Sequence, residues 1–354
     1  MKRNVKIIAV LLMVMMLVSV TGCSKQQPAP GAPAEKKEVF QFKLAHFWAA
    51  NSPIETQFVQ LWIKAVEEAT DGQIIIKSYP GETLLTANEM YDGVVNGIAD
   101  MGISFFSYSR GRFPVVETIE LPGIVFHTAK SGSRSAWDLI NELNPAEVKD
   151  TQLLMVATTG PAYLTTQKPV RNLADIKGME IRTTGASAKG IDALGGVAVA
   201  LSMGESYEAL SRGVVKGILG PCDIYDTWKL GEVTDYVTVS PFIYNSLFYL
   251  TMNKDKFEGM PADLQAKFKE VNAKVYEDIL SGLYDRLNGA ALEGALQRGE
   301  LEKIELDPAE IEKWMAKFEV TQNAYVADLE SKGLPGLKAL DRIKELAEKY
   351  NAIE

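Results

Sequence analysis

Short apolar stretches alternate with amphipathic ones twice along the chain, and this alternation restricts the fold more than any other feature. Period-two or continuously apolar runs of four to eight residues predict strands, and apolar residues at helical spacing predict helices between them. The strands are predicted at 39–46, 73–79, 99–105, 153–159, 164–167, 178–183, 198–201 and 217–219. The helices are predicted from Pro53 to Val66 and at 87–96, 186–194 and 205–212. A β-α-β order of this kind indicates two α/β lobes built on mainly parallel sheets.

A long apolar stripe follows the second lobe. It begins near Leu264, continues through Leu292 and extends to about Arg298, where Gly299 ends it. One helix of about 36 residues would be roughly 54 Å long, which exceeds one lobe and predicts a helix that bridges both. Two further helices are predicted at 308–331 and 337–350. We therefore expect a two-lobed clamshell with long bridging helices and a ligand between the lobes.

Residues 1–22 have the three-part pattern of a secretory signal peptide: basic residues, a short apolar core and small residues before a cleavage point. The sequence Val20-Thr21-Gly22-Cys23 resembles a bacterial lipobox, in which Cys23 is lipidated and becomes the first mature residue. Residues 23–38 are rich in Pro, Ala, Gln and charge, which predicts a flexible lipid-anchored linker. An extracytoplasmic location, in the periplasm or at the cell surface, follows from these predictions.

The composition argues against several classes of protein. The formal net charge of −9 disfavours nucleic-acid binding, and two cysteines with two histidines leave little for a metal site. The chain has no Gly-x-Ser-x-Gly motif, no Gly-x-Gly-x-x-Gly motif and no phosphate-binding loop. We therefore expect neither an enzyme nor a bound cofactor or metal.

Arg182 is the most informative single residue. It ends a predicted strand, just before a predicted helix start at Ala186 or Ser187. A guanidinium can bind both oxygens of a carboxylate, and the free N–H groups of a helix start also favour an anion. On spacing alone, a surface arginine at a strand end is an equally good interpretation.

The segments around Arg182 resemble the dicarboxylate-receptor (DctP) type of substrate-binding component of tripartite ATP-independent periplasmic (TRAP) transporters. The resemblance covers about 39–345, and its most specific part is a Lys-Gly pair, a strand, an arginine and then Glu-x-Tyr-x-Ala-Leu. Here these are Lys177-Gly178, Arg182 and the run from Glu205 to Leu210. Other segments that carry it are FKLAHFWAANSP, ELPGIVF and FYLTMNKDKFEGMPADLQAKF.

The resemblance implies how the molecule is divided and what it does. It implies a first lobe of residues 39–159 with 248–287 and a second of 160–247 with 288–354. It further implies that Arg182 binds the carboxylate of an organic acid. The receptor would then deliver the acid to a small and a large membrane subunit for import driven by an ion gradient.

Departures from the sialic-acid receptors of this family bear on the ligand. The stretch GPAYLTT, with Tyr163, has no second arginine, and GILGPCD has Leu219 and Gly220 where those receptors have a Glu-Asn pair. A polyol would leave buried polar groups unpaired at a cost of ~1–3 kcal/mol each. We therefore expect a monocarboxylate with an apolar or aromatic body.

Residues after the predicted strands supply the remaining candidates for ligand contact. They are His46, Phe47, Trp48, Asn88, Phe105, Phe106, Tyr108, Tyr163, Met203, Cys222, Tyr225 and Trp228. Several of these aromatic residues are equally compatible with the core, and Cys222 is expected to be a packed thiol and not a nucleophile. A C4-dicarboxylate or a 2-oxo acid is the alternative ligand, and a sensory receptor with the same capture step is the alternative function.

Overall fold

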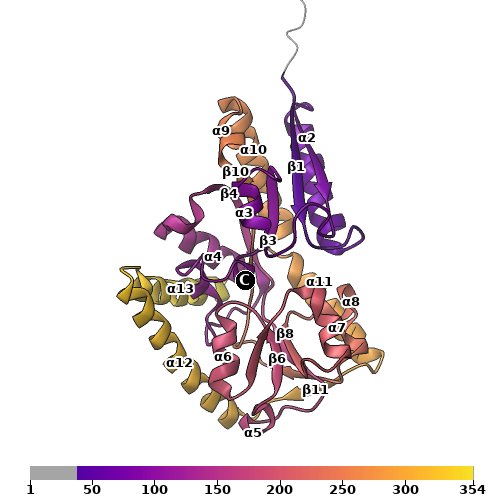
Figure 1. Ribbon diagram of the computed structural model, residues 1–354, viewed down its shortest axis with the longest axis vertical. Helices are drawn as coiled ribbons and strands as arrows, with labels where there is room; N and C mark the ends of the chain where they lie inside the picture. The colour runs from indigo at the N-terminus through magenta and orange to yellow at the C-terminus, as the bar shows by residue number, and fades with distance from the viewer. Residues whose placement is uncertain (1–37, 354) are drawn as a thin grey trace, which may run out of the picture. The chain divides into compact units, whose positions relative to one another are not determined.

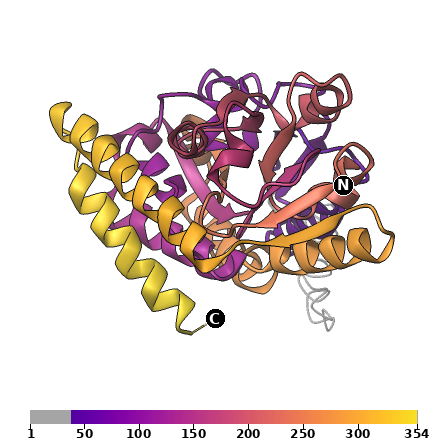
Figure 2. The same ribbon diagram turned by 90° about the horizontal axis from the view of Figure 1, so that it is seen from below.

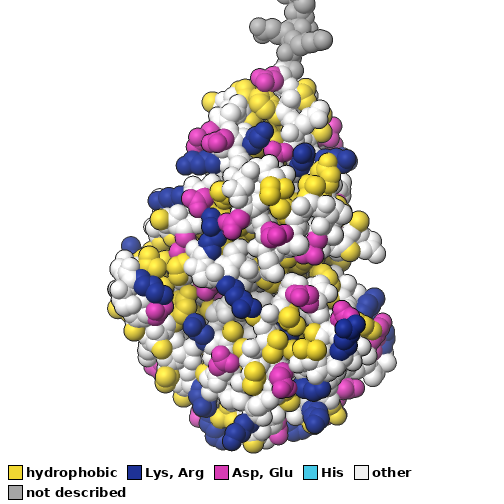
Figure 3. All heavy atoms as spheres, in the orientation of Figure 1, with side chains coloured by type: hydrophobic (Ala, Val, Ile, Leu, Met, Phe, Trp, Pro, Cys, Tyr) yellow, Lys and Arg dark blue, Asp and Glu magenta, His cyan; other side chains and the backbone are white. Residues whose placement is uncertain are grey.

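The computed structural model describes residues 38–353, of which 39–353 belong to one compact unit. The predicted signal peptide, the lipidation site Cys23 and nearly all of the linker lie outside the described residues. Within the described part, no helix combines the length and apolarity needed to cross a membrane. On the face shown in Figure 3, acidic and basic side chains are interspersed without a continuous basic surface.

The first lobe contains a five-stranded sheet of order β2-β1-β3-β10-β4 (Figure 1). Its strands are β1 (Phe40–His46), β2 (Ile74–Tyr79), β3 (Met101–Phe105), β4 (Thr151–Thr158) and β10 (Leu247–Asn253). β1 pairs in parallel with β2 and β3, whereas β10 is antiparallel to β3 and β4. The sheet is mixed and not mainly parallel, because β10 returns to it from the second lobe and runs in the opposite direction.

The second lobe contains a six-stranded sheet of order β11-β9-β5-β8-β6-β7. Its strands are β5 (Tyr163–Thr166), β6 (Glu180–Thr183), β7 (Val197–Ala200), β8 (Gly217–Gly220), β9 (Tyr236–Val239) and β11 (Glu302–Glu305). β6 is parallel to β7 and β8, and β5 is antiparallel to β8 and β9. Strands β9, β10 and β11 were not predicted. β11 has a single apolar residue in Glu-Lys-Ile-Glu, whereas Tyr-Val-Thr-Val in β9 is typical of a strand and was missed.

Helices cover both sheets. Those that begin at Gln60, Met90, Ser187 and Ser206 lie close to predicted helices, whereas those that begin at Ala129, Leu173 and Ile224 were not predicted. The helices up to the second sheet are α2 (Gln60–Ala69), α3 (Met90–Val95), α4 (Ala129–Leu143) and α5 (Leu173–Ile176), with a π-helical turn over Glu55–Val59 before α2. Those that follow are α6 (Ser187–Leu194), α7 (Ser206–Ser211), α8 (Ile224–Thr227) and α9 (Lys254–Glu258). Short 3₁₀ turns lie at Phe106–Tyr108, Val116–Glu120, Ala146–Val148, Met203–Glu205 and Leu230–Glu232.

Two crossing segments join the lobes side by side. The chain leaves the first sheet after β4 and comes back to it through β10, and the backbone N–H of Thr159 donates to the carbonyl of Ser246 at 2.9 Å. Nearby, the N–H of Ala162 donates to the carbonyl of Tyr244 at 3.1 Å. The two crossing segments are therefore hydrogen-bonded to each other. We refer to this pair of segments, 159–162 and 244–246, as the hinge.

The predicted single bridging helix is interrupted. It consists of α10 (Ala262–Val275), a π-helical turn (Tyr276–Leu280) and α11 (Leu283–Gln297). Gly282, with φ −108° and ψ 9°, lies outside the helical region and separates the two helices. Ser281-Gly282 is a poor helix-forming pair, since serine competes for backbone hydrogen bonds and glycine loses most entropy in a helix.

The last two helices connect the lobes at one side of the molecule. α12 (Pro308–Ser331) packs against α6 of the second lobe, whereas α13 (Gly336–Asn351) packs against α4 of the first. Figure 2 shows α12 and α13 running side by side. The contacts of α13 depart from the expected assignment of all of 288–354 to the second lobe, because its apolar face is buried on first-lobe residues such as Leu139.

A buried acid, Glu120, lies against the hinge. Its Oε1 accepts from the backbone N–H of Leu247 at 2.7 Å and from the Ser246 hydroxyl at 3.3 Å. Burial raises the pKa of Glu120 to about 8, although the Leu247 N–H lowers it and Glu117 adds to the rise. The hinge is therefore built around a carboxyl group that keeps its proton at neutral pH.

This arrangement predicts a pH-dependent stability. Glu120 holds its proton more tightly in the folded protein than in the unfolded chain, so its stabilising contribution is complete below pH 4.5 and is lost as pH rises through about 8. We expect the free energy of unfolding to fall more steeply between pH 5 and 8 for the natural protein than for Glu120→Gln. Denaturant unfolding at several pH values measures both slopes, and equal slopes would contradict the assignment. Glu142→Gln, at an exposed position, is the control that should keep the natural slope.

Candidate functional site

Arg182 lies on β6 and is held on both sides by neighbouring strands. Its backbone is in register with Val199 of β7 and Ile218 of β8, in parallel pairing. The side chain is 1% exposed and reaches the first lobe, where its Nη2 meets the hydroxyl of Tyr108. The sheet therefore fixes a cation in the interface between the two lobes.

The guanidinium has fewer partners than it can bind. Its Nε donates to the carbonyl of Leu201 at 3.0 Å, and Nη2 donates to the hydroxyl of Tyr108 at 3.3 Å. Nη1 is buried and has no hydrogen-bond partner among the described residues. No carboxylate of residues 38–353 forms an ion pair with Arg182 within 4.0 Å. A buried charge without a counter-charge is costly, so this site favours an incoming anion.

Tyr108 supports the same conclusion from the opposite lobe. Its hydroxyl oxygen accepts from Arg182 and from the backbone N–H of Met203 at 3.1 Å, which occupies both lone pairs. Burial raises the pKa of Tyr108 to about 12, so the hydroxyl keeps its hydrogen at neutral pH. That hydrogen is free to be donated to an anion beside Arg182.

A small cavity between the lobes contains Arg182 and is walled mainly by aromatic rings. Its lining residues are Phe47, Trp48, Phe105, Tyr108, Thr159, Arg182, Met203, Pro221, Asp223, Trp228, Tyr244 and Tyr284. The ring of Phe47 stacks on Trp48 at 3.9 Å between centroids and lies 5.8 Å from that of Phe105. The cavity thus combines one cation with an apolar, aromatic surface.

The lobes are closed on this cavity. The ring of Phe47 from the first lobe stacks on Trp228 of the second at 6.3 Å, and Arg110 donates to the carbonyl of Ala200 at 3.2 Å. The cavity volume is about 20 Å³, which is close to the space needed for one water molecule. A larger solute therefore enters only when the lobes separate.

Seven of the residues predicted from the sequence line this cavity. They are Phe47, Trp48, Phe105, Tyr108, Arg182, Met203 and Trp228. In the first lobe they come from the ends of β1 and β3 and the turn after β3, and in the second from β6, the turn after β7 and the end of α8. Their convergence follows from the rule that sites lie beyond the carboxyl ends of strands.

The other predicted residues lie elsewhere in the structure. Phe106 packs on Phe113 and Tyr249 in a separate part of the core, with ring centroids 4.8 and 4.9 Å away. His46 is buried with its Nε2 2.7 Å from Oε2 of Glu55. Each of the two therefore already has partners that account for its position.

Four more of the predicted residues do not line the cavity. Tyr225 is buried with its hydroxyl 2.7 Å from that of Thr165. Tyr163 is half-buried against the same core, and Cys222 is buried beside the cavity residues Pro221 and Asp223. Asn88 is exposed and lines a second, outer pocket near Arg110.

Sequence reasoning did not single out Asp223, Tyr244, Tyr284 and Thr159, all of which line the cavity. Thr159 and Tyr244 belong to the two crossings, and Tyr284 lies on α11, so only the tertiary arrangement brings them together. Asp223 had a usable signal, because it closely follows the end of β8. An acidic side chain just after a buried strand is a candidate for a site.

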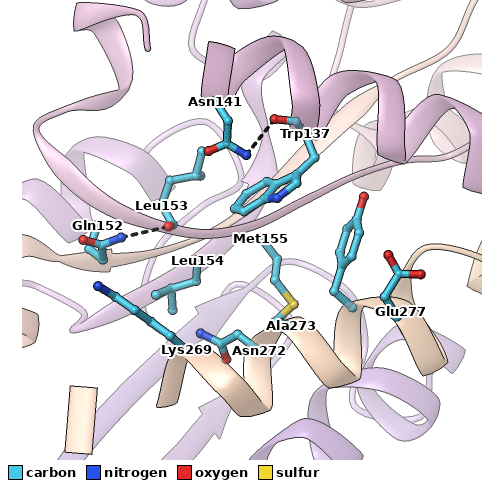
Figure 4. Close-up of a pocket in the computed structure, with 11 residues that line it drawn as sticks. Trp137, Asn141, Gln152, Leu153, Leu154, Met155, Lys269, Asn272, Ala273 and Glu277 are labelled. Atoms are coloured by element: carbon cyan, nitrogen blue, oxygen red, sulfur yellow. Dashed lines mark hydrogen bonds between the residues drawn. The ribbon is translucent and has the colours of Figure 1, made fainter. Parts of the chain in front are cut away.

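A larger groove on the outside of the first lobe is a different kind of surface. It lies between α4, β4 and α10 and is shown in Figure 4, where Trp137, Met155 and Lys269 are among the labelled residues. Lys269 is exposed, so its charge is already solvated. This groove therefore lacks the buried cation that distinguishes the cavity around Arg182.

Two α/β lobes that close on a buried cation define a solute-binding protein, and comparisons with known proteins identify the family. Residues 44–328 match the model of the bacterial extracellular solute-binding protein family 7, DctP. The chain is 26% identical over 204 residues to the 2,3-diketo-L-gulonate-binding periplasmic protein of Escherichia coli K12, covering 56% of this chain and 62% of that protein. It is 24% identical over 285 residues to the C4-dicarboxylate-binding periplasmic protein of Rhodobacter capsulatus, covering 78% and 83%.

Solved structures agree with the sequence comparison. A TRAP solute-binding protein of Rhodoferax ferrireducens in complex with copurified benzoate has a TM-score of 0.82 and 25% identity, covering 89% of this chain and 99% of that one. A marine metagenome TRAP solute-binding protein specific for aromatic acids, bound to metahydroxyphenylacetate, has a TM-score of 0.83 and 26% identity, covering 88% and 99%. The present chain belongs to the DctP family of TRAP solute-binding proteins, which are transport receptors and not a class of enzymes.

The environment of Cys222 yields a prediction about its reactivity. Burial raises the pKa of this thiol to about 12, and the neighbouring Asp223 adds to the rise. Since the thiolate is the reactive form, we expect negligible alkylation of Cys222 by iodoacetamide at pH 8 in the native protein. Mass spectrometry of the peptide that contains Cys222 measures this, with denaturant-unfolded protein as the positive control. Alkylation of the native protein at the rate of a free thiol would disprove the prediction.

Proposed function

We propose that this protein is an extracytoplasmic receptor that captures a monocarboxylate with an apolar or aromatic body and delivers it to TRAP membrane subunits. The observation that carries the proposal is the buried guanidinium of Arg182, whose Nη1 has no partner in a cavity lined mainly by aromatic residues. A carboxylate would accept from Nη1 and from the hydroxyl of Tyr108. One charge-assisted hydrogen bond of this kind contributes about 1.5–3 kcal/mol.

The walls of the cavity favour an aromatic or apolar body over a sugar acid. Phe47, Trp48 and Phe105 offer ring faces and edges, and Met203 adds an adaptable apolar side chain. Burying about 150 Å² of apolar ligand surface would contribute ~4 kcal/mol before the costs of binding. The benzoate and metahydroxyphenylacetate complexes of the two similar structures support the same choice.

Closure links capture to delivery. An acid bound to Arg182 would add contacts in the second lobe while its body lies against Phe47 of the first, so it stabilises the closed arrangement. The membrane subunits would then recognise the closed receptor. A lipid anchor at Cys23 and a linker to residue 38 would keep the receptor near the membrane.

A C4-dicarboxylate remains the second candidate ligand, because the relative from Rhodobacter capsulatus binds this class. A sensory receptor would use the same capture and closure and differs only in its partner. Recovery of the receptor in a complex with the TRAP membrane subunits, tested with purified components, distinguishes transport from sensing.

The role of Arg182 is tested by Arg182→Ala. We expect the affinity for a bound aromatic carboxylate such as benzoate to fall by at least about 30-fold, because about 2 kcal/mol or more is lost with a buried charge pair. We also expect the ligand-free variant to unfold at no lower denaturant concentration, since the change removes an unpaired buried charge. Calorimetry and denaturant unfolding measure the two effects, with the exposed Arg212→Ala as control. Unchanged affinity in Arg182→Ala would refute the proposal.

The ligand class is tested by a thermal-shift screen of aromatic monocarboxylates beside C4-dicarboxylates and 2-oxo acids. We expect benzoate-like acids to raise the melting temperature more than succinate or fumarate at equal concentration, since binding to the folded state stabilises it. A shift produced by dicarboxylates alone would contradict the argument from the aromatic walls.

A further inference from the structure

The cavity around Arg182 is lined by a second ionisable residue, Asp223. Asp223 lies three residues after the end of β8 and is 4% exposed. Its backbone N–H donates to Oδ1 of Asn288 at 3.0 Å, and Nδ2 of Asn288 donates to the carbonyl of Thr159 at 2.9 Å. Asn288 on α11 therefore fixes the loop that carries Asp223 against the hinge.

Asp223 has no cationic partner among the described residues. It forms no ion pair with Arg182 within 4.0 Å, although both residues line one cavity. The groups that face it are the hydroxyl of Thr227 and the exposed Asp226 on α8, and Tyr284 on α11. The thiol of Cys222 lies beside it in the chain and is also influenced by it. Arginine and aspartate thus occupy separate positions in the wall and do not neutralise each other.

This separation restricts what can bind. A carboxylate placed on Arg182 leaves the rest of the solute to meet Asp223, which accepts hydrogen bonds in both of its protonation states. A second carboxylate near Asp223 would face a like charge or would require a proton. Asp223 is already buried when the lobes are closed, so an entirely apolar body would leave its carboxyl away from water without adding a hydrogen-bond partner, which costs free energy.

We propose that Asp223 is a specificity-determining residue, which accepts a hydrogen bond from a hydroxyl or amino group on the acid held by Arg182 and excludes acids with a second carboxylate. The inference rests on the proposed function and narrows its ligand class to hydroxy- or amino-substituted monocarboxylates. Thr227 and Asn288 hold Asp223 in place and are not themselves in the cavity lining.

The ionisation of Asp223 adds a pH dependence. Burial raises the pKa of Asp223 to about 7, with the hydroxyl of Thr227 lowering it and Asp226 adding to the rise. The carboxyl therefore loses its charge as the pH falls below neutrality. A dicarboxylate should accordingly bind better at pH 6 than at pH 8.

The experiment measures calorimetric affinities of the full chain for benzoate, 3- and 4-hydroxybenzoate, 3-aminobenzoate and the dicarboxylate isophthalate. For the natural protein we expect the best substituted benzoate to bind at least about 10-fold more tightly than benzoate. This gain in affinity is what one hydrogen bond from its hydroxyl or amino group to a charged Asp223 would contribute. Isophthalate should bind weakest at pH 8 and gain affinity at pH 6.

Two substitutions separate the two parts of the proposal. In Asp223→Leu, the affinities for the hydroxy- and aminobenzoates should differ from the affinity for benzoate by no more than about 3-fold. In Asp223→Asn, the amide oxygen still accepts, so the preference should persist, whereas isophthalate should gain about 10-fold at pH 8 and lose its pH dependence. Asp235→Asn, at an exposed position that is not among the groups acting on Asp223, is the matched control and should behave as the natural protein. Unfolding curves confirm that each variant is folded.

The outcomes distinguish this inference from the proposed function. If Arg182→Ala abolishes benzoate binding while Asp223→Leu keeps the natural preference, the inference about Asp223 is wrong and the proposed function stands. A natural protein that prefers benzoate or isophthalate to the substituted acids would likewise overturn the inference. If no carboxylate binds the natural protein, both are overturned.

Discussion

The buried guanidinium of Arg182 is the constraint on which the arrangement of the two lobes depends. β6 and its two neighbours fix its position, Leu201 and the hydroxyl of Tyr108 satisfy two of its nitrogens, and the third has no partner. A buried cation costs free energy unless an anion pairs with it. The space between the lobes is therefore suited to binding an anion and not to staying closed without one. The aromatic residues around it complete a pocket that is apolar except at a few defined points.

The polar groups of the pocket lie on different elements, and the hinge fixes the positions of these elements relative to one another. Tyr108 follows β3 of the first lobe, Asp223 follows β8 of the second, and Thr159 lies at the crossing between them. Asn288 joins the last two through its side-chain amide. Because α11 carries Asn288, the helix that spans the lobes also positions part of the cavity wall.

Much of the fold could be predicted from the sequence, because strand and helix periods are local properties. The sequence also predicted that Arg182 lies at a strand end, and that Phe47 and Phe105 lie at or just after the ends of two other strands. Tyr284 and Tyr244 were not, since a helix face and a crossing acquire their neighbours only in the folded chain. The break at Gly282 was missed because apolar residues at helical spacing continue on both sides of it, so the sequence pattern shows no interruption.

The stack of Phe47 on Trp228 has a practical consequence, because it joins one ring from each lobe. Trp228 is half-buried, and separation of the lobes would transfer its indole from a hydrocarbon contact to water. The emission of an indole depends on the polarity around it. The molecule therefore carries a built-in optical indicator of its own opening, at a position that reads the gap between the lobes directly and needs no attached dye.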